Sequence, residues 1–277
     1  MNRRTLVHSV ALSAFGTSYL PKCLESAAQG PRWQLDGVGS RARIGVLTPD
    51  FDPVPESEVT AMAPRGVSVH SSRVVRHRQA RAFAEPPHVD NAVDRLAELA
   101  PRAILYGYSS SSYVIERREE DALRDRLEQR VSGTTVILAT LAAVAALRAL
   151  KVKRIAIMHP PWFSAEMNAS GERYYRGHGF DVLQCARMTP ARTFTEVPAA
   201  EVFERAKALV PAGAEALFIA GNGLRAVGAI SALEEVLERP VLTANQVLLW
   251  AALQRVGGAN EVTPYGRIFQ TPVSGAG

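Results

Sequence analysis

The sequence contains few of the residues that build disulfide frameworks, metal sites or nucleic-acid surfaces. Its two cysteines, Cys23 and Cys185, stand far apart without metal-ligand spacing, so we expect neither a disulfide framework nor a zinc site. Lys and Arg (32) exceed Asp and Glu (27) only slightly, and no basic tract is interleaved with aromatic residues. We therefore expect no nucleic acid among the partners. The mild positive charge is compatible with a small anionic substrate.

Motifs for nucleotide and hydrolase chemistry are also missing. There is no G-x-S-x-G elbow and no phosphate-binding loop, which argues against a serine hydrolase and a nucleotidase. The loop Gly221-Asn222-Gly223 begins like a dinucleotide loop, but the run G-N-G-L-R-A-V-G lacks the third glycine at the required spacing. We therefore expect no bound NAD. No pair of histidines has the spacing of metal ligands.

Residues 1–30 have the layout of a twin-arginine export signal. Arg3 and Arg4 precede a mildly apolar stretch at 6–20, and small residues follow at 26–28. The stretch is too short and too interrupted for a membrane span. We predict a periplasmic protein with no membrane contact after signal removal. The alternative is an overextended reading-frame start, which would make the protein cytoplasmic.

The strongest pattern in the chain is an internal repeat. Arg43–Pro49 is echoed by Arg154–Pro160 at an offset of 111 residues, and Ala103–Gly107 by Ala216–Ala220 at 113. All four are short apolar runs that end in polar or glycine-rich residues, as buried parallel strands do. Helical segments alternate with them. We predict an α/β protein of two pseudo-symmetric, flavodoxin-like halves with parallel sheets and a site in the cleft between them.

The two halves are expected to interleave along the chain. We assign residues 41–135 and 245–277 to the first half and residues 136–244 to the second. Residues 48–56, rich in proline and aspartate, are expected to form a loop, and residues 138–150, nearly all Ala and Leu, a buried helix. No low-complexity linker separates the halves, so we expect them to pack closely.

Two loops that follow predicted strands carry hydrogen-bond donors suited to a carboxylate. Ser109 and Ser110 stand where a strand ends and a helix begins, so hydroxyls and helix-start amides would lie together. Asn222 and Gly223 stand at the matching place in the other half, where glycine permits close approach and the asparagine amide can donate. The alternative for the serines is simple capping of the helix.

Two further loops contain candidate site residues, each of which also has an ordinary structural explanation. Asp52 lies in a proline-stiffened loop after the first strand, where a role in binding a ligand competes with a role as a turn residue. His159 ends a strand in the second half and is a candidate general acid or base, or else a neutral histidine bonded to the backbone. Trp162 follows it as a candidate apolar wall.

Taken together, these segments resemble the aspartate/glutamate racemase superfamily, in its maleate isomerase and arylmalonate decarboxylase branch. The resemblance covers roughly residues 41–269 and is carried by their order and spacing. The segments are Arg43–Pro49 with Glu56, Met62–Pro64, Tyr108–Tyr113, Ala146–Leu150, Gly221–Arg225 and Pro240–Gln246. The resemblance implies a site between two pseudo-symmetric halves with no metal or organic cofactor. It also implies catalytic cysteines at the ends of equivalent strands, and loop hydroxyls and amides that stabilise an enediolate-like intermediate.

The match fails at the cysteines. The resemblance places the first cysteine position on Tyr108 and the second on Gly221, and Cys185 is expected to be structural. A phenol is a far weaker nucleophile than a thiolate near neutral pH, so covalent isomerisation by the family's usual route is not expected. Asp52 stands where the isomerases have asparagine, which weakens the expectation of a second bound carboxylate.

These expectations combine into one functional hypothesis and one rival. We expect a cofactor-independent enzyme that isomerises, racemises or decarboxylates a small carboxylate or dicarboxylate, with homo-oligomerisation left open. Tyr108 and His159 are the candidate proton donors or acceptors. The expected substrate-binding residues are Asp52, Ser109, Ser110, Trp162, Asn222 and Gly223. The rival is a non-catalytic carboxylate-binding protein on the same scaffold.

Overall fold

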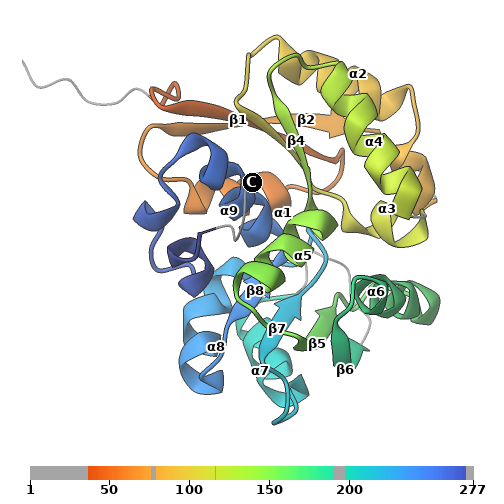
Figure 1. Cartoon of the computed structure of the whole chain (residues 1–277), viewed down its shortest axis with the longest axis vertical. Helices are drawn as coiled ribbons and strands as arrows, with labels where there is room; N and C mark the ends of the chain where they lie inside the picture. The colour runs from red at the N-terminus through yellow and green to blue at the C-terminus, as the bar shows by residue number, and fades with distance from the viewer. Residues whose placement is uncertain (1–36, 76–78, 116, 190–196, 273–277) are drawn as a thin grey trace, which may run out of the picture. The chain divides into compact units, whose positions relative to one another are not determined.

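The computed structural model describes residues 37–75, 79–115, 117–189 and 197–272, and within them eight strands form two four-stranded sheets (Figure 1). All strand pairs are parallel. The first sheet has the order β2-β1-β3-β4 and the second β6-β5-β7-β8. The predicted α/β class with two parallel sheets is thus confirmed. The predicted export signal lies outside the described residues.

The strand bounds show why the repeat was visible in the sequence. The first sheet consists of β1 (Ala42–Pro49), β2 (Val67–Val74), β3 (Ala103–Tyr106) and β4 (Thr135–Leu138). The second consists of β5 (Arg154–His159), β6 (Asp181–Arg187), β7 (Ala216–Ile219) and β8 (Val241–Thr243). The echoed segments are the two central strands of each sheet, β1 and β3 against β5 and β7. Central strands are covered on both faces, so their residues are almost all apolar.

Helices connect successive strands and flank both sheets (Figure 1). They are α1 (Val54–Met62), α2 (His88–Ala97), α3 (Ser109–Val114), α4 (Arg117–Gln129), α5 (Ala139–Ala149), α6 (Ala165–Gly177), α7 (Ala199–Leu209), α8 (Ile230–Leu237) and α9 (Ala244–Val256). Short 3-10 turns include η1 (Ala80–Ala84) and η3 (Val227–Ala229). None of the described helices is long and apolar enough to cross a membrane.

Two segments differ from the sequence expectation. Of the proline- and aspartate-rich stretch 48–56, only residues 50–53 form a loop, because β1 extends to Pro49 and α1 begins at Val54. Pro55 lies in the first turn of α1, where a missing amide hydrogen costs nothing. Strand β4 was not predicted. Its four residues run directly into the Ala/Leu-rich helix α5, so the apolar pattern does not mark where one element ends and the next begins.

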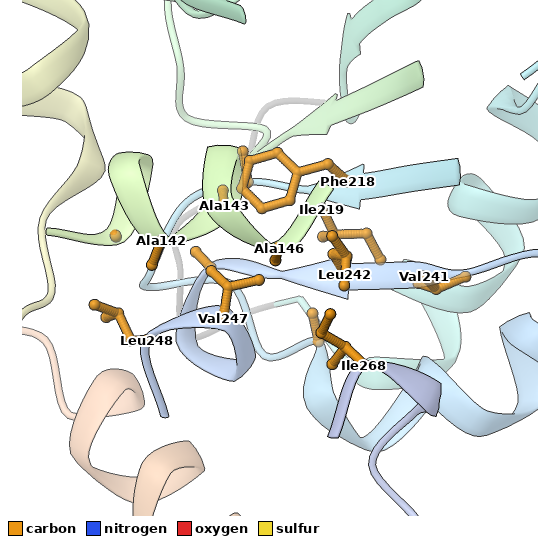
Figure 2. Close-up of a cluster of buried hydrophobic side chains, with 14 of the residues drawn as sticks. Ala142, Ala143, Ala146, Phe218, Ile219, Val241, Leu242, Val247, Leu248 and Ile268 are labelled. Atoms are coloured by element: carbon orange, nitrogen blue, oxygen red, sulfur yellow. The ribbon is translucent and has the colours of Figure 1, made fainter. Parts of the chain in front are cut away.

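The closest helix packing in the core uses alanine. Figure 2 shows Ala142, Ala143 and Ala146 of α5 facing Val247 and Leu248 of α9, with β7 and β8 beside them. All five side chains are buried. Helix α9 follows β8 of the second sheet but also contacts α1, β3 and β4 of the first half. Small side chains on α5 let this shared helix approach closely, and α9 thereby joins the two halves.

We predict that Ala146→Leu lowers the free energy of unfolding by about 1–3 kcal/mol, because the added carbons enter a filled core. Urea denaturation followed by circular dichroism measures the effect. The matched control is Ala208→Leu at an exposed position of α7, for which we expect a change within about 0.5 kcal/mol. Equal losses in the two variants would contradict this account of the packing.

Candidate functional site

The loops after β3 and β7 meet in one hydrogen bond. The backbone amide of Ser109, the first residue of α3, donates to Oδ1 of Asn222 over 3.0 Å. Both residues are buried, and 113 positions separate them in the sequence. The serine loop of one half and the Gly221–Gly223 loop of the other therefore lie together.

The Asn222 side chain is held from its other end as well. Its Nδ2 donates to Oδ1 of Asn245 over 2.9 Å, and Nδ2 of Asn245 donates to the backbone oxygen of Asn222 and to Oε2 of Glu58, both over 2.8 Å. Because each partner has only one hydrogen-bonding role, this pattern also decides which way both amides point. One hydrogen of the Asn222 amide, which is expected to donate to a ligand, is thus donated to Asn245.

Glu58 completes this chain of contacts from α1. Its Oε1 accepts the amide hydrogens of Ala226, over 2.7 Å, and Val227, over 3.0 Å, at the start of η3. Burial raises the pKa of Glu58 to about 7, and the hydrogen bonds from Asn245 and the two amides oppose that rise. Its carboxylate thus joins α1 of the first half to η3 and α9.

Local capping explains why Asn245 is so well placed. Thr243 accepts the Gln246 amide hydrogen over 3.3 Å, and the Gln246 side chain accepts from the Thr243 amide over 3.1 Å. This capping box sets the first turn of α9. Asn245 lies inside that turn and reaches Asn222 and Glu58. The T-A-N-Q pattern in the sequence signalled the helix start but not the partners of Asn245.

Asp52, in the loop between β1 and α1, contacts the same second-half loop. Its Oδ1 accepts the Val54 amide hydrogen over 3.0 Å. Its Oδ2 lies so close to Gly223 that a Cβ at that position would stand 2.6 Å away. Burial raises the pKa of Asp52 to about 6, against the lowering effects of the Val54 amide and Arg73. The loops after β1, β3 and β7 therefore converge.

The serines of α3 have unequal surroundings. Ser111 Oγ donates to the backbone oxygen of Tyr108 over 2.9 Å and lies 2.8 Å from the Tyr106 hydroxyl. Ser109 Oγ, by contrast, is buried with no hydrogen-bond partner among the described residues. A buried hydroxyl without a partner carries an uncompensated desolvation cost. Ser109 thus has a donor to offer beside Asn222, and Ser110 is buried next to it.

The two predicted proton carriers lie in different surroundings. Tyr108 precedes α3 and packs on Phe83 of η1, with ring centroids 4.4 Å apart. His159 is fully buried, with Nδ1 2.9 Å from Oδ1 of Asn168 and Nε2 3.4 Å from the Tyr113 hydroxyl. Burial lowers the pKa of His159 to about 4. The environment of His159 matches the expectation of a neutral histidine, but its partners are side chains.

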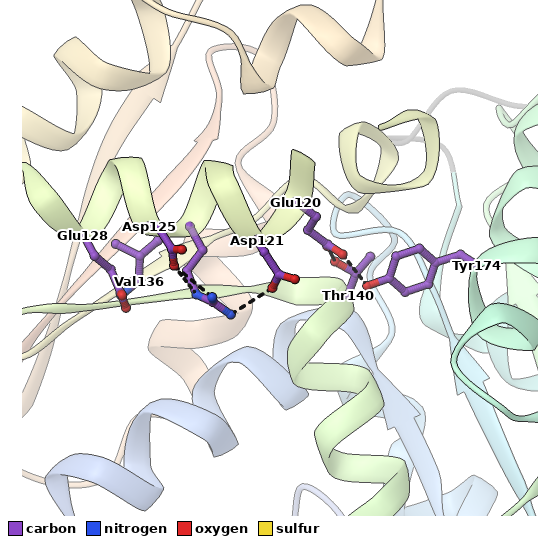
Figure 3. A network of polar contacts seen from close by, with 8 residues as sticks. Glu120, Asp121, Asp125, Glu128, Val136, Thr140 and Tyr174 are labelled. Carbon is purple, nitrogen blue, oxygen red and sulfur yellow. Dashed lines mark hydrogen bonds and ion pairs between the residues drawn. The ribbon is translucent and has the colours of Figure 1, made fainter. Parts of the chain in front are cut away.

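Behind α3, His159 belongs to a buried polar and aromatic cluster. Tyr113 lies between His159 and Tyr174, with ring centroids 5.6 Å from each. Figure 3 shows Tyr174 and Thr140 both directed at Glu120 of α4, to which their hydroxyls donate over 2.7 and 2.5 Å. Burial raises the pKa of Glu120. The cluster supports α3 from behind and joins it to α4, α5 and α6.

The structure places Cys185 on β6 beside His159, and Trp162 in the turn that follows β5. Cys185 Sγ lies 3.6 Å from His159 Nδ1, and burial raises the pKa of its thiol to about 12, so it is not a thiolate at neutral pH. Trp162 is 37% exposed in the turn between β5 and α6. Among the described residues, no three His, Cys, Asp or Glu side chains gather as metal ligands.

Comparison with known proteins identifies the family of this chain. A model of the arylmalonate decarboxylase family matches residues 85–269, about two thirds of the sequence.

The chain belongs to the arylmalonate decarboxylase family.

Solved structures share its fold. The maleate isomerase Iso from Pseudomonas putida S16, in a variant crystallised with maleate, is 20% identical with a TM-score of 0.71, covering 83% of this chain and 98% of that one. A Nocardia farcinica maleate cis-trans isomerase mutant with a covalently bound succinylcysteine intermediate is 22% identical with a TM-score of 0.72, covering 82% and 98%. An arylmalonate decarboxylase is 20% identical with a TM-score of 0.67, covering 83% and 99%. No curated protein sequence matches the chain. The resemblance found in the sequence is confirmed at the level of the family and fold.

Within this family fold, the backbone at Gly221 explains why a glycine stands there. Its φ is +88°, and a Cβ would lie 2.3 Å from Cγ of Pro160. A cysteine at this position would therefore be strained and would collide with the loop after β5. In this member of the arylmalonate decarboxylase family, the conformation of the loop therefore requires glycine at residue 221.

Sequence reasoning missed Glu58, Asn245, Arg73 and Tyr113 as parts of this region. Arg73 of β2 donates to the backbone oxygen of Asp52 over 2.6 Å and pairs with Glu56. For Glu58 the sequence offered no distinct signal, because the stretch 54–62 also contains Glu56 and two polar residues, Ser57 and Thr60. That pattern does not tell a buried carboxylate from an exposed one.

We predict that Glu58→Ala lowers the free energy of unfolding by about 2–4 kcal/mol, because it leaves two backbone amides and Asn245 Nδ2 without their acceptor. The measurement is urea denaturation at pH 8. Glu56→Ala on the same helix is the matched control, with an expected loss below about 1 kcal/mol, since Glu56 is half-exposed and paired only with Arg73. A loss at Glu58 no larger than at Glu56 would count against the network.

We further predict that the His159 imidazole stays neutral between pH 8 and pH 5. Its folded pKa of about 4 lies below the ordinary value of 6.5. The stability it contributes is therefore present above pH 6.5 and is lost as the pH falls towards 4. Carbon-detected or proton–carbon NMR of the imidazole, assigned with His159→Gln, checks this. A midpoint near 6.5 would show that the ring is accessible to solvent after all.

Proposed function

We propose that the protein is a cofactor-independent enzyme that acts at the carbon next to a carboxylate of a small organic acid, by isomerisation, racemisation or decarboxylation. Membership of the arylmalonate decarboxylase family supports the reaction class. The related folds include enzymes named for maleate and for arylmalonates, both small dicarboxylates. We extend this substrate class to the present chain.

The observation that carries the proposal is the buried Ser109 hydroxyl, which has no partner among the described residues and lies beside Asn222. A carboxylate oxygen is the natural acceptor for such a donor, and the charge that develops on an enediolate strengthens the hydrogen bond. The hydroxyl of Ser110 and the backbone of Asn222 and Gly223 would complete the carboxylate pocket, with Tyr108 and Trp162 as neighbouring walls.

The chemistry differs in one respect from that of the Nocardia relative, whose structure carries a covalent succinylcysteine intermediate. Of the two cysteines in this chain, Cys23 lies outside the described residues and Cys185 is a partly buried thiol beside His159. For racemisation and decarboxylation we therefore propose a route without a covalent cysteine adduct, in which the protein exchanges a proton with the substrate carbon.

The test is turnover by the purified protein of four acids. They are phenylmalonate, followed by release of CO2; maleate, followed by formation of fumarate; and mandelate and 2-phenylpropionate, followed by deuterium incorporation at the α-carbon in D2O. We expect turnover of at least one. Binding that raises the melting temperature without any turnover would contradict an enzymatic role and favour a carboxylate-binding protein.

We predict that Ser109→Ala lowers kcat/KM by about 10²-fold while leaving the free energy of unfolding unchanged or slightly higher. The hydroxyl has no partner to lose, so its removal affects the ligand and not the fold. Ser111→Ala, in the same helix, is the matched control and should lose about 1 kcal/mol, because Ser111 bonds Tyr106 and Tyr108. Full activity in Ser109→Ala would contradict the proposed carboxylate pocket.

A further inference from the structure

The backbone around Asp52 is fixed by contacts that leave part of its carboxyl group unused. Thr48 Oγ1 and Arg73 Nη1 donate to the backbone oxygen of Asp52 over 3.1 and 2.6 Å. The Val54 amide donates to Oδ1. Among the described residues, no donor is hydrogen-bonded to Oδ2. The loop therefore holds the carboxyl group in one orientation without satisfying its second oxygen.

That second oxygen faces the loop of the other half. Asp52 is only 5% exposed, and its Oδ2 lies against the backbone of Gly223. The preceding residue, Asn222, accepts the hydrogen bond that the Ser109 amide donates. An acceptor oxygen that receives no donor from the protein is available to a proton, a water molecule or a ligand group.

We propose that Asp52 is the catalytic proton carrier of this site, with Oδ2 as the atom that exchanges the proton with the substrate's α-carbon. This inference rests on the function proposed above. In exchange or racemisation, the α-carbon–hydrogen bond breaks, its proton goes to Oδ2, and its electron pair passes into the carboxylate to give an enediolate. The proton then returns to the carbon. In decarboxylation, the carbon–carbon bond breaks, CO2 leaves, and the protonated Asp52 delivers its proton to the enediolate carbon and is reprotonated from water.

The charges around Asp52 suit this role. The charged and titratable groups that face it are Arg73 on β2 and Glu56 and Glu58 on α1. Burial and the Glu56 charge raise its pKa, while the Val54 amide and Arg73 lower it, and the result of about 6 leaves both protonation states populated near neutral pH. Glu58 also has a raised pKa, but both its oxygens already accept protein donors. Of these two buried carboxyl groups, Asp52 is the one with an oxygen to spare.

The other titratable candidates contact neighbouring side chains. Both ring nitrogens of His159 face protein side chains, and the Cys185 thiol contacts His159 and Asn168. The Tyr108 ring packs on Phe83. In this proposal Asp52, which the sequence suggested only as a substrate-binding residue, takes the proton-transfer role in place of Tyr108 and His159.

Asp52→Asn is the direct test, because an asparagine retains an oxygen for the Val54 amide while removing the titratable proton. The matched control is Asp50→Asn, which makes the same charge change at an exposed position of the same loop. A third variant, Gly223→Ala, keeps Asp52 but places a Cβ against its Oδ2. Circular dichroism and the melting temperature establish that each variant is folded.

The four acids used to test the proposed function are assayed with all variants between pH 5 and pH 8. We expect Asp52→Asn to lose at least about 10²-fold in kcat, to bind the same acids within a few-fold by thermal shift, and to lose the pH inflection near 6. In the wild type, deuterium exchange should rise with pH through about 6, since it starts from the carboxylate, and decarboxylation should fall, since it starts from the acid. Gly223→Ala should lose activity without Asp52 being changed, and Asp50→Asn should match the wild type.

Two results overturn the assignment in distinguishable ways. Wild-type turnover together with an Asp52→Asn variant that keeps its kcat within twofold, and keeps the inflection, overturns the role of Asp52 alone. Absence of wild-type turnover on all four acids overturns the proposed function and the role of Asp52 with it.

Discussion

The arrangement of this protein depends on satisfying buried polar groups where its two α/β halves meet. The Ser109 amide, the Asn222 and Asn245 side chains and the Glu58 carboxylate form one continuous series of hydrogen bonds. Each group is buried, so each would cost free energy if its partner moved away. Apolar packing between α5 and α9 brings the halves together, but it tolerates small displacements. The polar series does not, and it therefore sets the relative position of the loops that follow β3 and β7.

The same region contains two buried carboxyl groups that differ in how many hydrogen bonds they accept. Glu58 accepts three donors and behaves as part of the framework, whereas Asp52 accepts one amide hydrogen and leaves Oδ2 facing Gly223. Burial raises the pKa of both groups towards neutrality. A structural carboxylate needs all its acceptor positions filled, while a group that exchanges protons needs one left open. The difference between these two residues thus separates a framework role from a chemical one.

A family fold can remain while the group that performs its chemistry changes, because the fold supplies the anion pocket and the reactive group is a single side chain. Here the glycine at 221 is required by its positive φ and by Pro160, so the loop geometry itself excludes a cysteine. A buried cluster packs against α3 on the side that faces the second half. It consists of Tyr113, Tyr174, His159 and Glu120. Its histidine is fully buried, and burial lowers the pKa of the imidazole to about 4, although a strand end is a position where catalytic residues are common.

The sequence alone determined the α/β class, the duplication and the pairing of the loops after β3 and β7. These features were predictable because buried parallel strands are short local runs of apolar residues, and such runs can be recognised when they recur. It also singled out Ser109, Ser110, Asn222 and Gly223, whose loops the structure brings together. It did not reveal strand β4, the helix at Val54, or the partners of those residues. Only the tertiary structure decided that Asn222 bonds protein, that Glu58 is buried and that Asp52 faces Gly223. The physical reason is distance along the chain. Apart from the contact of Asn222 with Asn245, these contacts join residues 113 to 187 positions apart, and no local pattern encodes which buried donor meets which acceptor.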